Sequence, residues 1–108
     1  MRKIIGEKIC KIMNTPIELS RVISENNYST KGENFVVIKN VEICEITLNS
    51  TTTNNIIIKA LTNVKILPDV NKIDELYDEI LITNGACVEF YFIDDIWYIS
   101  SSDGLKLE

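Results

Sequence analysis

The strongest constraint on the fold is an alternating stretch near the C-terminus. Two strand-like runs, Cys87–Ile93 and Ile96–Ser101, flank the dipeptide Asp94-Asp95. Two-residue connections are common in β-hairpins, and aspartate tolerates the left-handed backbone that such turns require. The spacing therefore predicts a tight antiparallel hairpin with a defined register. The expected pairs are Ile93 with Ile96, Phe92 with Trp97, Tyr91 with Tyr98 and Phe90 with Ile99.

The two faces of this hairpin differ in what they can pack against. Strand alternation places one apolar set together, which we predict to face the core: Val88, Phe90, Phe92, Trp97 and Ile99. The opposite face carries Tyr91, Ile93, Ile96 and Tyr98, beside more polar residues. A solvated sheet face is normally polar, and tyrosine is enriched in protein interfaces. We therefore interpret these four residues as a candidate oligomer interface.

The rest of the chain also favours strands. It is 45% hydrophobic and rich in isoleucine, which is typical of β-structure. Further strands are expected at Phe35–Ile38, Val41–Leu48, Ile56–Leu61, Val64–Leu67 and Ile80–Thr83. The polar run Asn49–Asn55 is expected to be an exposed tip, and Asn84-Gly85 a turn. The predicted fold is mainly β, a small antiparallel β-sandwich or barrel-like module without internal repeats.

Two segments carry helical signals. Ile5, Ile9, Ile12 and Met13 recur at helical spacing, although a strand or an extended arm remains an alternative. Thr15-Pro16-Ile17-Glu18 matches a capping box, so a helix is expected to run from there to about Asn26. Val70–Ile80 is expected to form a short helix or helical turn. The chain thus divides into an arm and capped helix over residues 1–27 and a β-rich body over residues 35–108, together one folding domain.

Charge is distributed unevenly along the chain. The net charge is −5, but residues 1–13 set Arg2, Lys3, Lys8 and Lys11 against Glu7, which gives +3 and leaves −8 elsewhere. An acidic body argues against nucleic acid as a partner. The four basic residues are a candidate anchor for a protein partner, and the alternative is a solvated amphipathic edge. No stretch is apolar for long enough to span a membrane, and we do not expect the start of the chain to act as a secretory signal peptide.

No catalytic or metal-binding constellation emerges from the sequence. The chain has no histidine, and Cys10, Cys44 and Cys87 are too widely spaced for a zinc motif or a disulfide framework. The acidic residues Asp74, Glu75, Asp78 and Glu79 are interpreted as a solvated face, and Asp94-Asp95 as turn residues. Trp97 is interpreted as a core residue rather than a sugar-stacking platform. Ser100-Ser101-Ser102 has no general base nearby in the sequence that could activate a serine nucleophile. We expect no enzymatic activity, cofactor or metal.

One pattern, from Ile46 to the C-terminus, resembles a known group of proteins. It comprises ITLNSTTTNNIIIKA, KILP and ITNGACVEFYFIDDIWYISSSDG. A Thr/Asn-rich loop before a strand, an Ile-x-Leu-Pro-like element, an Asn-Gly turn and a closing Trp-Tyr-aliphatic strand are similar to small β-modules of tailed-bacteriophage head fibres, tail fibres and capsid-decorating proteins. The closing turn Asp94-Asp95-Ile96 departs from that pattern, which usually has glycine beside threonine or asparagine.

The resemblance implies a homotrimeric, non-enzymatic virion component that is assembled in the host cytoplasm. On that interpretation, the N-terminal segment docks on the capsid or another virion protein. Two alternatives are kept: a tail-fibre module that binds a receptor or carbohydrate, and a small enzyme subunit with an active site shared at an interface.

Overall fold

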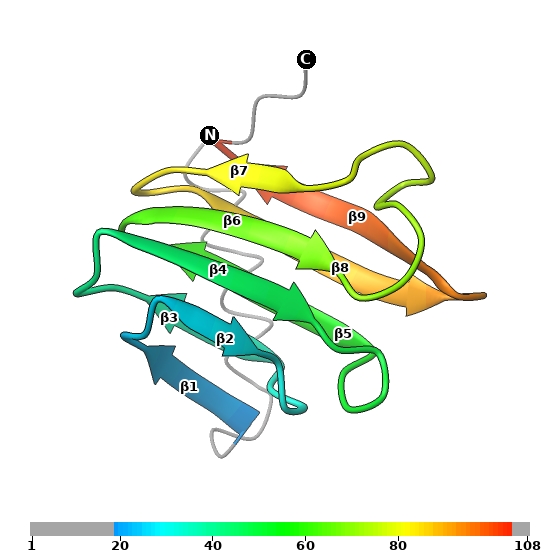
Figure 1. Ribbon diagram of the computed structural model, residues 1–108, viewed down its shortest axis with the longest axis horizontal. Helices are drawn as coiled ribbons and strands as arrows, with labels where there is room; N and C mark the ends of the chain where they lie inside the picture. Colours follow the sequence, from blue (N-terminus) through cyan, green and yellow to red (C-terminus); the bar gives the residue numbers. More distant parts are fainter. Residues whose placement is uncertain (1–18, 105–108) are drawn as a thin grey trace.

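A computed structural model describes residues 19–104 and folds them into two β-sheets that pack face to face (Figure 1). The described strands are β1 (Ser20–Ile23), β2 (Asn27–Ser29), β3 (Phe35–Ile38), β4 (Ile43–Leu48), β5 (Asn55–Ala60), β6 (Asn63–Pro68), β7 (Ile80–Ile82), β8 (Cys87–Ile93) and β9 (Ile96–Asp103). The five-stranded sheet has the order β1-β3-β5-β8-β9, and the four-stranded sheet β2-β4-β6-β7. The prediction of a mainly β fold is confirmed.

The first six strands form a coil, because consecutive strands alternate between the two sheets. Strands of successive turns pair in parallel, β1 with β3 and β3 with β5 on one side, and β2 with β4 and β4 with β6 on the other. Ser20 pairs with Phe35, and Phe35 with Ile57, so the first turn takes 15 residues and the second 22. The fold therefore repeats in space although the sequence contains no repeated motif.

Antiparallel pairing is confined to the end of the coil. Strand β7 pairs with β6, β8 pairs with β5, and β9 pairs with β8. The prediction of an antiparallel sandwich is thus wrong for the N-terminal half, where both sheets are parallel. The physical reason is the path of the chain: from β1 to β6 each return to a sheet follows one strand in the other sheet, and such a crossover lets the two paired strands run in the same direction.

The core lies between the sheets and is built mainly from β-branched residues. In the five-stranded sheet, Val36, Ile56, Ile58 and Val88 point inward and are fully buried. The four-stranded sheet contributes Cys44, Ile46, Val64 and Ile66. Each group follows the two-residue alternation of a strand, so the apolar pattern of the sequence indicates which face of each strand points inward.

The C-terminal hairpin has the predicted register. Ile93 pairs with Ile96 and Phe92 with Trp97, as do Tyr91 with Tyr98 and Phe90 with Ile99. Asp94 and Asp95 have positive φ angles of 51° and 66°, the backbone of a two-residue hairpin turn. A register shift after Phe90 then lengthens β9 beyond the expected end at Ser101.

Neither helix expectation holds within the described residues. Residues 1–18, which include the capping box, lie outside them, but Ser20–Ile23 of the expected helix is strand β1. Its β-branched Val22 and Ile23 pair with Val37 and Ile38, and this tertiary pairing overrides a weak helical pattern. Strands β1 and β2 both belong to the sheets, so the β-rich body begins before residue 35.

The expected helix over Val70–Ile80 is instead a turn. Asp74 and Glu75 have positive φ angles of 57° and 60°, which a right-handed helix excludes. Ile73 and Tyr77 form a bridge across them, and Ile73 is fully buried. The spacing of Ile73 and Tyr77 that suggested a helix therefore reflects two residues facing each other across a tight turn.

Candidate functional site

The outer face of the five-stranded sheet carries apolar side chains across its whole width. All five strands contribute to this apolar face, which comprises Val22, Phe35, Val37, Ile57, Tyr91, Ile93, Ile96 and Tyr98. Strand register and alternation place these side chains opposite the inward-facing core residues. Tyr91 and Ile93 are 41% and 54% exposed, and Val22 is 57% exposed.

The outer face of the four-stranded sheet is different in chemistry. Lys65 lies at its centre, with its Nζ 3.9 Å from the carboxylates of both Glu45 and Glu79. Thr47 stands on the neighbouring strand β4, Asn63 lies on the same strand as Lys65, and the exposed apolar side chains here are Ile43 and Leu81, at opposite ends of the mixed set. A mixture of ion pairs and hydroxyls is what a solvated face requires. The contrast between the two faces therefore singles out the apolar face as the candidate interaction surface.

The predicted interface residues occupy one end of the apolar face. Tyr91 pairs with Tyr98, and Ile93 with Ile96, so the four side chains form one contiguous patch beside the hairpin turn. The sequence did not predict that Val22, Phe35, Val37 and Ile57 share this face, because the order of the strands in the sheet does not follow from the sequence. The available signal was the unbroken apolar run in β3 and β5, since a strand that is apolar on both faces is covered on both. The predicted anchor residues Arg2, Lys3, Lys8 and Lys11 lie outside the described residues.

The acidic segment after β6 has a structural role at the edge of β9. Asp74 donates its backbone N–H to Trp97 O (2.9 Å), and its Oδ1 accepts the N–H of Ile99 (2.9 Å). Asn71 Nδ2 donates to Asp95 O at 2.8 Å. The unpaired backbone N–H and C=O groups of an edge strand can pair with another chain and cause aggregation. This turn covers part of the edge of β9. Among residues 19–104, no group of three or more potential ligands is placed to hold a metal.

Trp97 is a core residue, as predicted. It is fully buried, and its ring lies 4.9 Å from that of Phe92 at 47°. Its Nε1 donates to Asp69 Oδ1 at 3.1 Å, while Asp69 Oδ2 accepts from Ser50. Burial opposes ionisation of Asp69, but hydrogen bonds from Ser50 and Trp97 hold its pKa below the ordinary value. A buried indole cannot serve as a stacking surface for a sugar.

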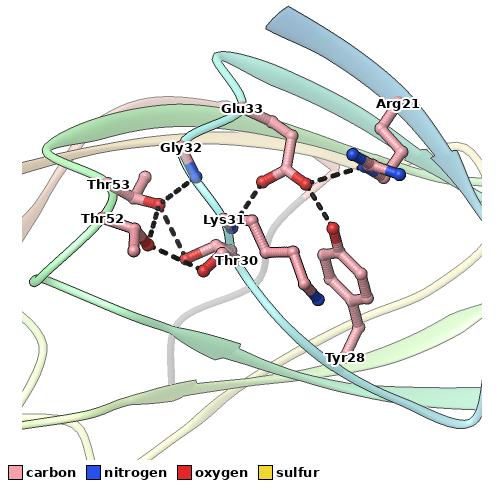
Figure 2. A network of polar contacts seen from close by, with 8 residues as sticks. All are labelled: Arg21, Tyr28, Thr30, Lys31, Gly32, Glu33, Thr52 and Thr53. Carbon is pink, nitrogen blue, oxygen red and sulfur yellow. Dashed lines mark hydrogen bonds and ion pairs between the residues drawn. The ribbon is translucent and has the colours of Figure 1, made fainter.

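A second polar cluster, which sequence reasoning missed, joins the first turn of the coil to the second (Figure 2). We call it the Glu33 network. Glu33 is 5% exposed, and its carboxylate accepts hydrogen bonds from Tyr28 Oη, from Arg21 Nε (3.0 Å) and from the Lys31 N–H (2.8 Å). Lys31 Nζ also lies 4.3 Å from the centre of the Tyr28 ring. Strand β1, strand β2 and the loop between β2 and β3 are thereby held at one point.

Threonines extend the network between successive turns of the coil. Thr30 and Thr53 are buried, and Thr53 Oγ1 donates to Thr30 Oγ1 at 2.9 Å. Gly32 donates its N–H to Thr53 Oγ1 at 3.0 Å, and Thr52 Oγ1 donates to Thr30 O at 2.8 Å (Figure 2). The expectation that the whole run Asn49–Asn55 is an exposed tip is therefore wrong at Thr53, which stacks against the preceding turn.

The Glu33 network holds fixed protonation states. Burial opposes ionisation of Glu33, but hydrogen bonds from Tyr28, Lys31 and Arg21 outweigh it and hold its pKa below 4.5. Burial, followed by the hydrogen bond to Glu33, raises the pKa of Tyr28 to about 12. Burial also raises the pKa of the Cys44 thiol to about 11. General acid–base groups work best with a pKa near the ambient pH, so these groups are suited to holding the fold together.

These shifts predict how stability depends on acidity. A carboxyl group with a lowered folded pKa stabilises the fold above its unfolded pKa, and that contribution disappears as the pH falls through the folded value. We expect the free energy of unfolding to decrease as the pH falls below about 4.5, measured by urea unfolding across a pH series. Glu33→Gln should flatten this dependence, and a residual slope from Asp69 should remain. An unchanged slope in the variant would contradict the role given to Glu33.

Comparison with known proteins assigns no family to this chain. No protein-family model matches the sequence, and no curated protein matches it. The structure, within the part of the chain that it describes, contains no helix long and apolar enough to cross a membrane.

Proposed function

We propose that this protein is a structural, non-enzymatic component of a tailed-bacteriophage virion, and that it works as a homotrimer. The single observation that carries the proposal is the exposed end of the apolar face, where Tyr91 and Ile93 stand beside Ile96 and Tyr98. Monomeric proteins rarely leave such a contiguous apolar patch in water, and closed symmetric assembly covers it. The resemblance of the C-terminal half to head-fibre and capsid-decorating modules supports the virion setting.

The proposed role divides the work between two parts of the chain. The hairpin end of the apolar face joins neighbouring subunits, and the basic residues Arg2, Lys3, Lys8 and Lys11 dock the assembly on the capsid or another virion protein. Residues 19–104 supply a rigid module, since the coil is held by its core and by the Glu33 network. The burial of Trp97 weighs against a carbohydrate site on that residue.

Self-association is tested by a charge placed at the centre of the patch. We expect the unsubstituted protein to be a trimer in sedimentation velocity at micromolar concentration. We expect Ile93→Asp to weaken association by about tenfold or more, because a carboxylate would be desolvated at the interface. Leu81→Asp is the matched control, since Leu81 is 60% exposed on the opposite outer face and Ile93 is 54% exposed.

The outcomes of this comparison are distinct. A trimer that survives in Leu81→Asp and dissociates in Ile93→Asp supports the proposed interface. A monomeric parent protein contradicts the trimer. If both variants associate equally well, Ile93 does not lie in the interface. The virion assignment has its own test, which is mass spectrometry of purified particles: hundreds of copies indicate capsid decoration or a head fibre, and absence from the particle removes the virion role.

A further inference from the structure

The apolar face is covered unevenly. Ile57 stands on its central strand β5 and is only 2% exposed, although it lies outside the core cluster. Glu89, its pairing partner on β8, is 6% exposed, while Ile93 on the same strand is 54% exposed. Neighbours within a sheet cover the flanks of a side chain but not its top. The centre of this face therefore has an occupant, and the hairpin end does not.

The chain segment before β1 has the length and starting point to be that occupant. Residues 1–18 lead directly into β1, which is the edge strand of this sheet. Five strands at a spacing of about 4.8 Å make a face about 19 Å wide. Eighteen residues would be about 27 Å long as a helix. The segment can therefore cross the face from β1 to β9 without a further connection.

The composition of the segment also fits the face. Ile5, Ile9, Ile12 and Met13 share one side at helical spacing, and such a stripe requires an apolar surface to cover it. The segment is basic and the rest of the chain acidic, and Glu89, whose Oε1 accepts hydrogen bonds from Ser100 and Ser101, places a carboxylate among the apolar side chains of the face. Buried carboxylates are stabilised by nearby cations.

We infer that residues 1–18 pack their apolar side across the centre of the apolar face of their own subunit, over Ile57. Covalent attachment favours the chain's own segment over that of a second copy, because a short tether gives an effective concentration of about millimolar. The exposed patch around Tyr91 and Ile93 stays open to a neighbouring subunit. The inference concerns contacts within one subunit, so it stands whether or not the proposed trimer forms.

The first test measures how well the centre of the face is protected. Ile9→Asp/Ile12→Asp should release the segment, and iodoacetamide should then alkylate Cys87, which is 8% exposed in the structure, at least about tenfold faster. Cys44 lies in the core at 0% exposure and reports on global unfolding. Glu7→Gln, at a polar position of the same segment, should leave both rates unchanged. Equal Cys87 rates in the parent and the double variant would overturn the inference, provided that Cys44 stays protected.

The second test uses the unsubstituted protein and decides the matter if the double variant unfolds. Chains labelled with ¹⁴N and ¹⁵N are mixed unfolded, refolded together and treated with a short bismaleimide. Protection slows modification of Cys87 without abolishing it, so same-isotope links between Cys10 and Cys87 are expected to accumulate over a long incubation. Mixed-isotope links would assign the occupant to a second copy, and single modification of both thiols without any link would place the segment elsewhere. Either result overturns the inference.

Discussion

We expect Trp97→Ala to lower the free energy of unfolding by about 3–5 kcal/mol, the range for truncating a fully buried aromatic side chain. Trp97 is 0% exposed, packs against Phe92 and donates its indole N–H to Asp69. The substitution leaves a cavity where β9 meets the segment after β6, and it removes a hydrogen bond from Asp69. Domains of this size are usually stable by about 5–15 kcal/mol, so the loss is a large fraction of the total.

The measurement and its controls follow from the composition of the chain. Trp97 is the only tryptophan, so unfolding of the variant is followed by far-ultraviolet circular dichroism in urea. Trp97→Phe keeps most of the ring and should lose a smaller amount, about 1–2 kcal/mol, mainly through the Asp69 hydrogen bond. Leu76→Ala, at a side chain 63% exposed, should change stability by less than about 0.5 kcal/mol. A loss below about 1 kcal/mol for Trp97→Ala would contradict its place in the core.

The second large effect is expected at Glu33. Glu33→Ala removes the acceptor of Tyr28, Arg21 and the Lys31 N–H, and it leaves the Tyr28 hydroxyl buried without its partner. An unsatisfied buried polar group costs about 1–3 kcal/mol. The Arg21 side chain is 53% exposed and can be hydrated, so we expect a total loss of about 2–3 kcal/mol at pH 7.

Glu45→Ala is the matched control for Glu33→Ala. Its ion pair with Lys65 is exposed and 3.9 Å long, so the control should lose less than about 0.5 kcal/mol. A double-mutant cycle with Tyr28→Phe then isolates the coupling between Tyr28 and Glu33, because the two side chains are in direct contact. Additive losses in the cycle would show that the two residues stabilise the fold independently, which contradicts the network.

Local rules were enough to predict the C-terminal hairpin. A two-residue turn fixes the register of β8 and β9, so the residue pairs and the core position of Trp97 follow from spacing alone. The strands β3 to β7 are marked by apolar runs between turn residues. The candidate interface residues Tyr91, Ile93, Ile96 and Tyr98 were identified because an apolar outward face is unusual on any hairpin.

The remaining features depend on partners far apart in the chain. Nothing near Val22 indicates that it pairs with Val37, so a short apolar stripe was interpreted as helix. The Glu33 network forms only after the first turn of the coil brings Arg21 beside the loop that follows β2. Asp74 and Glu75 adopt a left-handed turn because β9 supplies partners for Asp74 and Glu75. Spacing within a sequence does not encode such contacts.

The coil has a consequence for the order in which the chain folds. Each parallel pair joins residues 15 to 22 positions apart in the chain, whereas the β8–β9 hairpin closes over two residues. Short-range closure is faster than long-range pairing, so the hairpin can nucleate first in the complete chain. During synthesis the order is reversed, because the coil emerges before the strand that pairs with β5. A nascent chain would therefore carry an open edge on β5 until Cys87–Ile93 leaves the ribosome.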